Sequence, residues 1–124
     1  MANEITMTAG LAASKNGALI NPGTQTKQQT MAGDDMLQQT VSVITTAGGQ
    51  QLTWGSITSV PACVMIKNLD TVNFVTVAGQ TGFTDVFQLK ILAGQTALFQ
   101  PLSADLWIIA DTDPVICLVC AVEA

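Results

Sequence analysis

Apolar and polar residues alternate along most of the chain with a period of two, the repeat of a β-strand that buries one face. In residues 86–92, which read VFQLKIL, the pattern predicts a strand with Phe87, Leu89 and Ile91 on one face. Segments of this kind recur about every ten residues, separated by Gly, Pro, Asn and Asp, which favour turns. No segment has the 3.6-residue period of a helix. The pattern predicts an all-β fold, an antiparallel sandwich or barrel of about nine or ten short strands.

The second half of the chain is more apolar than the first, which predicts a folded core at residues 36–124 and an N-terminal strand or arm at residues 1–35. At its centre, residues 62–77 join two apolar runs through the polar residues 67–70, and we expect a hairpin there. The last strand, residues 115–122, reads VICLVCAV and is apolar at every position. We therefore expect both of its faces to be covered.

Residues 24–30 contain almost no apolar side chain and cannot form a core strand. They fit an edge strand or an extended arm that pairs with the sheet edge of a neighbouring subunit, because an edge offers unpaired backbone groups. The candidate interaction residues are Thr24, Gln25, Thr26, Lys27, Gln28, Gln29 and Thr30.

Only 10% of the residues are charged, against about 25% in an average domain, and the net charge is −5 with no Arg and no His. A protein that binds nucleic acid or an anionic membrane needs a cationic surface, so neither partner is expected. The N-terminus lacks the basic and apolar regions of a signal peptide, and no window approaches the length of a membrane span. So few charges predict a protein that assembles with copies of itself.

Catalytic chemistry is not indicated, and no enzyme activity or cofactor is expected, because His and Arg are missing and no nucleophile or phosphate-loop motif is present. Asp34–Asp35 and the pair Asp111 and Asp113 could contribute to a calcium site, but turn chemistry explains them better. A glycosidase pair of carboxylates is a further alternative. Trp54 and Trp107 lie in apolar strand patterns, so we expect core residues rather than sugar platforms.

The three cysteines are Cys63, Cys117 and Cys120. Residues 117–120 match the spacing C-x-x-C of redox pairs and zinc sites. In a strand, however, residues three apart point to opposite faces, so we expect free thiols and no metal site. The odd number favours folding in a reducing compartment.

Two segments resemble small virion proteins of tailed bacteriophages. Residues 65–77, MIKNLDTVNFVTV, are similar to an apolar run followed by "N-L-D-x-x-N-(aromatic)-V". Residues 92–99, LAGQTALF, are similar to the next landmark of those proteins, "L-x-x-G-x-x-A-L-F". The opening residues, the acidic turn at 110–112 and the closing strand fit as well.

The resemblance implies a jelly-roll-like sandwich in a virion, assembled in the host bacterial cytoplasm. It implies a capsid decoration or cement protein that binds the outside of the major capsid protein shell and stabilises it, as a homotrimer. One alternative is a tail, fibre or receptor-binding module of the same particle. A second, from another class, is a carbohydrate-binding or hydrolytic β-sandwich.

Overall fold

The computed structural model describes residues 4–31, 33–84 and 87–123, and these residues form twelve strands and no helix. Among them, therefore, no helix is long and apolar enough to cross a membrane. The chain divides into two compact units, Met1–Ala32 and Gly33–Ala124, three residues before the predicted boundary. We call the described residues of the first unit the ribbon and those of the second unit the body.

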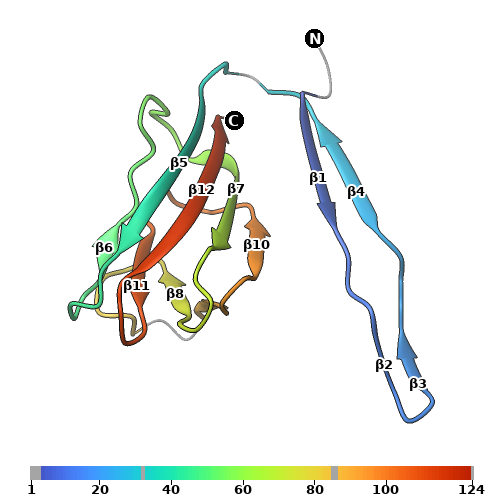
Figure 1. The fold of residues 1–124 in the computed structure, drawn as a ribbon. Coiled ribbons are helices and arrows are strands. Elements are labelled where there is room, and N and C mark those ends of the chain that lie inside the picture. The colour runs from blue at the N-terminus through green and yellow to red at the C-terminus, as the bar shows by residue number, and fades with distance from the viewer. Residues whose placement is uncertain (1–3, 32, 85–86, 124) are drawn as a thin grey trace. The chain divides into compact units, whose positions relative to one another are not determined.

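The body confirms the predicted antiparallel β-sandwich (Figure 1). One sheet has the strand order β10-β7-β12-β5 and the other has the order β6-β11-β8-β9. Two four-stranded sheets with these crossed connections are the arrangement of a jelly roll. The eight strands are β5 (Met36–Val43), β6 (Gln50–Gln51), β7 (Pro61–Asn68), β8 (Val75–Ala78), β9 (Leu89–Ile91), β10 (Thr96–Phe99), β11 (Trp107–Ala110) and β12 (Val115–Glu123).

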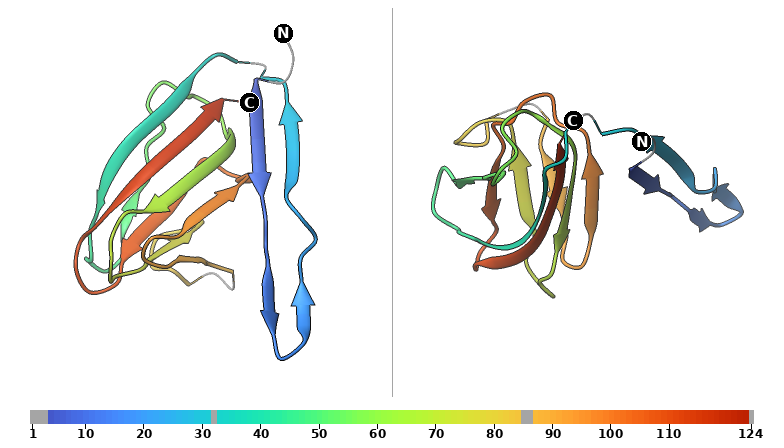
Figure 2. Two further views of the ribbon diagram at one scale, coloured as in Figure 1. Left: turned by 45° about the vertical axis from the view of Figure 1, so that its right-hand side comes forward. Right: turned by 90° about the horizontal axis from the view of Figure 1, so that it is seen from above.

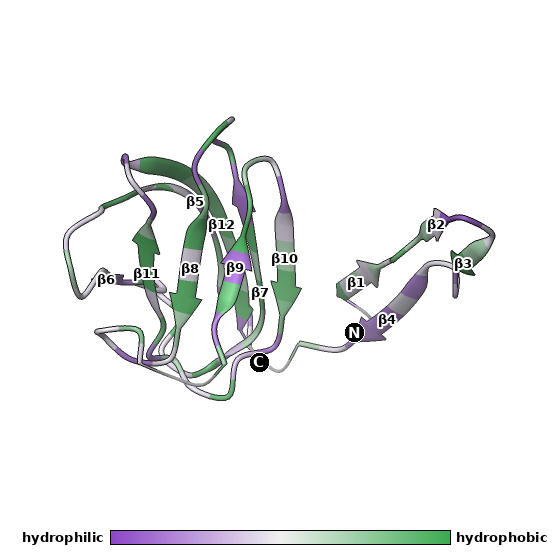
Figure 3. Ribbon diagram, turned by 90° about the horizontal axis from the view of Figure 1, so that it is seen from below, coloured by the Kyte–Doolittle hydropathy of each residue, from purple (hydrophilic) through white to green (hydrophobic). Residues whose placement is uncertain are grey.

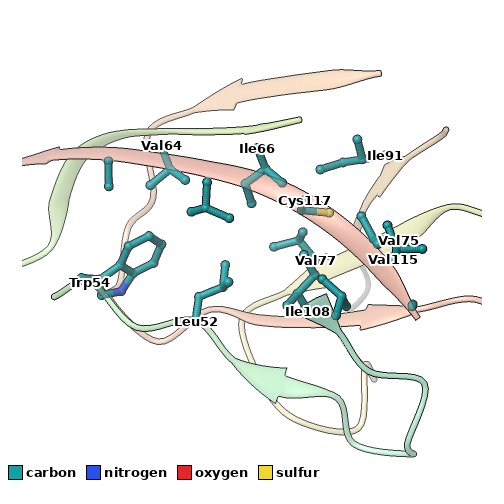
Figure 4. Packing of buried hydrophobic residues seen from close by; sticks show 14 of the residues in the cluster. Leu52, Trp54, Val64, Ile66, Val75, Val77, Ile91, Ile108, Val115 and Cys117 are labelled. Atoms are coloured by element: carbon teal, nitrogen blue, oxygen red, sulfur yellow. The ribbon is translucent and has the colours of Figure 1, made fainter. Parts of the chain in front are cut away.

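The core lies between the two sheets, where alternate residues of each strand point inward (Figure 4). Trp54 closes one end of the core, and its indole Nε1 donates a hydrogen bond of 2.7 Å to the carbonyl of Ala104. Indole N–H groups need such a partner when they are buried. The fully buried apolar side chains are Val43, Val64, Ile66, Val75, Ile108, Val115, Cys117 and Val119.

The prediction of a hairpin at residues 62–77 was wrong. β7 pairs with β10 and β12, whereas β8 pairs with β9 and β11 in the opposite sheet. The connection at residues 69–74 therefore crosses between the sheets. A hairpin usually has a loop of two to five residues, and the six residues here are held by side-chain hydrogen bonds that redirect the chain.

Two aromatic residues also depart from the predicted pattern. Phe87 is 77% exposed and precedes β9, so only Leu89 and Ile91 of the predicted face point inward; Val86, the start of that predicted strand, lies outside the described residues. Trp107 is half-buried and lies outside the core, because it opposes Ala78 and Gln51 on the outer face of its sheet. Its neighbour Ile108 occupies the inward position instead.

The ribbon is one long antiparallel hairpin, and its four strands raise the total above the nine or ten expected. β1 (Ile5–Ala9) pairs with β4 (Gln25–Gln29), and β2 (Ala13–Lys15) pairs with β3 (Ala18–Ile20). At its tip, Asn16 and Gly17 have φ angles of 52° and 85°. Positive φ at both central residues is the type I′ turn that Asn-Gly favours.

Candidate functional site

Asn68 at the end of β7 and the connection that follows it, residues 69–74, share a network of hydrogen bonds between side chains and backbone. Asn68 is fully buried. Its Nδ2 donates to the carbonyls of Asn73 (2.9 Å) and Ile91 (3.1 Å), and its Oδ1 accepts the N–H of Asp70 (2.8 Å). These bonds link β7 of one sheet to β9 of the other, so this polar centre supports the fold rather than binding a ligand.

Asp70 continues the same network. Its Oδ2 accepts the backbone N–H groups of Asn73 (2.6 Å) and Val72 (3.2 Å). These two bonds, that from Asn73 above all, favour the ionised form and lower the pKa of the Asp70 carboxyl below its usual value. The carboxylate is therefore a fixed acceptor that shapes the turn.

We expect Asp70→Asn to change the response of the protein to acid. A lowered pKa contributes stability that is present above the unfolded-state value and is lost as the pH falls through the folded-state value. The wild type should therefore exceed Asp70→Asn in free energy of unfolding near neutral pH, and the difference should shrink below about pH 4. Urea unfolding at several pH values measures it, and a difference that does not change with pH would contradict the assignment.

A cluster of three carboxylates joins the start of β5 to the end of β12. Oxygens of Asp34, Asp35 and Glu123 lie within 4.8 Å of one another. Glu123 Oε2 accepts the backbone N–H groups of Asp34 (3.1 Å) and Asp35 (3.2 Å), and the Glu123 N–H donates to the Asp35 carbonyl (2.9 Å). Calcium takes six to eight oxygen ligands. Three carboxylates carry six oxygens, but Glu123 Oε2 already accepts two backbone hydrogen bonds, and these bonds connect the segment before β5 to the end of β12.

The second acidic pair, Asp111 and Asp113, lies in the exposed turn between β11 and β12. The Asp111 N–H donates to the carbonyl of Phe74 (3.1 Å). Next to it, the Thr112 hydroxyl donates to Asn73 Oδ1 (2.7 Å). These bonds tie the turn to the connection between the sheets and agree with turn chemistry for this pair.

All three cysteines are free thiols, as expected. Cys117 points into the core, whereas Cys120, three residues further along β12, is half-buried on the opposite face. Burial, and to a smaller extent the charge of Asp70, raises the pKa of the Cys117 thiol to about 11. Burial also raises the pKa of Cys63. A thiol with a raised pKa is protonated near neutral pH and is a poor nucleophile.

An apolar depression of about 230 Å³ lies where β8 and β9 approach β10 and the segment that follows it. Its rim includes Phe87 and the fully exposed Leu102. Among the described residues, no titratable side chain lines this depression, so none of them offers a group for general acid–base chemistry there. The lining residues are Val77, Ala78, Gly79, Phe87, Leu89, Phe99, Pro101, Leu102 and Leu106.

The residues predicted to mediate interaction, 24–30, lie on and beside β4 of the ribbon. Thr24 to Gln28 and Thr30 are exposed, and Gln29 is half-buried. The Gln25 side chain donates to the carbonyl of Pro22 (3.1 Å), at the bend that leads into β4. Figure 3 shows β4 as a hydrophilic strand. In the structure, β4 pairs with β1. That residues 24–30 bind a neighbouring subunit stays a prediction.

Comparisons of the chain with models of protein families, with curated proteins and with solved structures gave no match.

Proposed function

We propose that this protein is a structural component of a bacteriophage particle, a decoration or cement protein on the outside of the major capsid protein shell. The observation that supports this proposal is the ribbon, a hairpin with almost no buried surface. The major capsid protein and further copies of this chain, three to an assembly, are its proposed partners. The assembly forms in the bacterial cytoplasm, and the particle is where the protein acts.

The ribbon needs a surface to pack against. Every residue of β2 and β3 is exposed, and among the described residues of the ribbon only Ile5 is buried. Leu11, Leu19 and Ile20 are 67%, 71% and 55% exposed. An isolated two-stranded ribbon is marginally stable in water at best. A ribbon with apolar side chains near its tip gains stability when that tip docks on another protein, which is what attachment to a shell would provide.

The residues that resemble phage virion proteins have structural roles in this fold. Asn68 and Asp70 hold the connection between the sheets. Residues 92–99 contain the turn between β9 and β10, where Gly94 has a φ of 76° and the Gln95 N–H donates to the Leu92 carbonyl (3.0 Å). Motifs that build a sandwich without a reactive group favour a structural role over a hydrolytic one.

Attachment through the ribbon tip is tested by binding to particles. Full-length protein should bind shells that lack it, whereas protein without residues 1–32 should fold and fail to bind. The double variant Leu19→Ser and Ile20→Ser should lose most of the binding, because it removes the exposed apolar tip and keeps the ribbon length. Lys15→Gln, at the same tip, is the matched control and should bind normally. Normal binding without the ribbon would overturn the proposal.

Copy number and salt separate a shell protein from a tail part. A decoration protein should be present on the order of hundreds of copies per particle, since many weak contacts add by avidity. It should also stay attached in about 1 M salt, where the Debye length is roughly 3 Å and exposed charges are screened. At most tens of copies would instead favour the tail or fibre module. Release by salt from an intact shell would show that charge holds the protein there.

A further inference from the structure

The sheet β10-β7-β12-β5 has a second apolar face, on the side away from the core. Along β12, the odd residues 115–121 point into the core and the even residues 116–122 point outward. Residues that oppose each other on neighbouring strands share a face, so the outward set extends across the sheet. Leu98, Met65 and Cys120 oppose one another in one row, and Cys63, Val122 and Met36 form another.

We call the apolar members of this set the outer apolar face; the same rows also contain the neutral polar residues Gln38, Thr40, Ser42 and Thr96. Lys67, in the row of Leu118 and Thr40, is the one charged residue in these paired rows. Ile116 is 46% exposed and Met36 is 64% exposed. The members are Met36, Cys63, Met65, Leu98, Ile116, Leu118, Cys120 and Val122.

The other sheet has an outer face of a different kind. There Lys90, Thr76 and Ile109 form one row, and Trp107 opposes Gln51 in the next. Figure 1 and Figure 2 show the two sheets as separate layers of the body, so each layer has one face that the other does not cover. A one-sided sheet normally alternates apolar and polar residues. The second sheet follows that rule in part, whereas β12 is apolar on both faces.

We propose that the outer apolar face is a permanent interface with further copies of this chain. β5, β7 and β12 have eight or nine residues each and β10 has four, so at about 3.3 Å per residue and 4.8 Å between strands the sheet covers roughly 450 Å² in plan. This matches the largest apolar patches of monomers, which often have a function.

The composition of the face indicates a second copy rather than a different protein. Permanent interfaces between identical chains resemble a core cut in half, whereas transient interfaces are enriched in Tyr, Trp and Arg. The outward rows of this sheet contain no aromatic residue, and their polar members are neutral except for Lys67. This near neutrality also suits identical chains, since copies that meet there bring few like charges together. The proposal of this interface does not depend on attachment to a shell. Only the expectation of a trimer rests on the proposed function.

The test places one charge at the centre of the face in the full-length chain. Wild type should be oligomeric by sedimentation, and Met65→Glu and Leu118→Glu should each weaken self-association by about 100-fold, because a charge would be buried without a partner. Thr76→Glu, on the outer face of the other sheet, is the matched control and should assemble as the wild type does. Circular dichroism should show that each variant keeps its fold.

Cys120 gives a second readout that needs no variant, because its thiol lies in the middle of the face. Alkylation of Cys120 should be slow in the assembled protein and should accelerate on dilution. Cys117, which points into the core, should stay unreactive throughout.

A monomeric wild type would overturn the inference, including a monomer whose own ribbon protects Cys120. Assembly that survives both glutamate variants would overturn it as well, as would a Cys120 rate that does not change with concentration. A dimer that the variants dissolve would support the interface and contradict only the proposed trimer.

Discussion

Replacing Asn68 by leucine is expected to lower the free energy of unfolding by about 3 to 5 kcal/mol, a loss seen for few single substitutions. Asn68 is fully buried, and leucine would fill much of its space without making its hydrogen bonds. The carbonyls of Ile91 and Asn73 would lose a donor, and the N–H of Asp70 would lose its acceptor. Each buried polar group left without a partner costs about 1 to 3 kcal/mol.

The control is the other asparagine of the same connection. Asn73 Oδ1 accepts an exposed hydrogen bond from the Thr112 hydroxyl, and its side chain also hydrogen-bonds the exposed carboxylate of Asp70, so Asn73→Ala should cost roughly 1 to 2 kcal/mol. Urea unfolding followed by tryptophan fluorescence measures both variants. A loss below 1 kcal/mol for Asn68→Leu would mean that the connection between the sheets holds without this residue.

The fold class was predictable because alternation is a local property that each strand displays in its own residues. The order in which the chain passes between the two sheets was not predictable, and the connection after β7 shows why. Asn68 and Asp70 were recognised as turn formers, but an Asx turn can close a hairpin or send the chain to another sheet. The choice depends on the bond from Asn68 to Ile91, which is 23 residues away in the sequence.

The candidate site shows the same limit. Asp34 and Asp35 were identifiable as a candidate acidic pair because they are adjacent in the sequence. Glu123, which completes their cluster, comes 88 residues after Asp35. Its position follows from the pairing of β5 with β12, and no pattern near the C-terminus indicates that partner. Trp107 was misplaced for a related reason. The run LWIIA is apolar at each position, so its sequence does not tell which residues face inward.

The outer apolar face, by contrast, left a signal in the sequence. Residues 115–122 are apolar at odd and even positions alike. This pattern predicted that both faces of the strand are covered. The core supplies that cover for one face, and Ile116 remains 46% exposed on the other. An apolar run therefore indicates that partners are needed without saying whether they come from the same chain.

Gly49→Ala is expected to lower the free energy of unfolding by about 2 to 4 kcal/mol, because two separate effects add. Gly49 has a φ of 67°, in the left-handed region that disfavours a side chain. A Cβ there would also lie 2.7 Å from the carbonyl oxygen of Ile108 and 2.7 Å from the ring of Phe83.

The control for Gly49→Ala separates the clash from the backbone conformation. Gly82 has a φ of 85°, and a Cβ on it would meet nothing within 4 Å. Gly82→Ala should therefore show the left-handed cost alone, roughly 1 to 2 kcal/mol. Since Ile108 is in β11 and its oxygen cannot move without disturbing the core, the extra loss at Gly49 should persist in urea and in thermal unfolding. If Gly49→Ala and Gly82→Ala lower the free energy of unfolding equally, the loop before β6 accommodates the added methyl group without a clash, and this account of the packing around Gly49 is wrong.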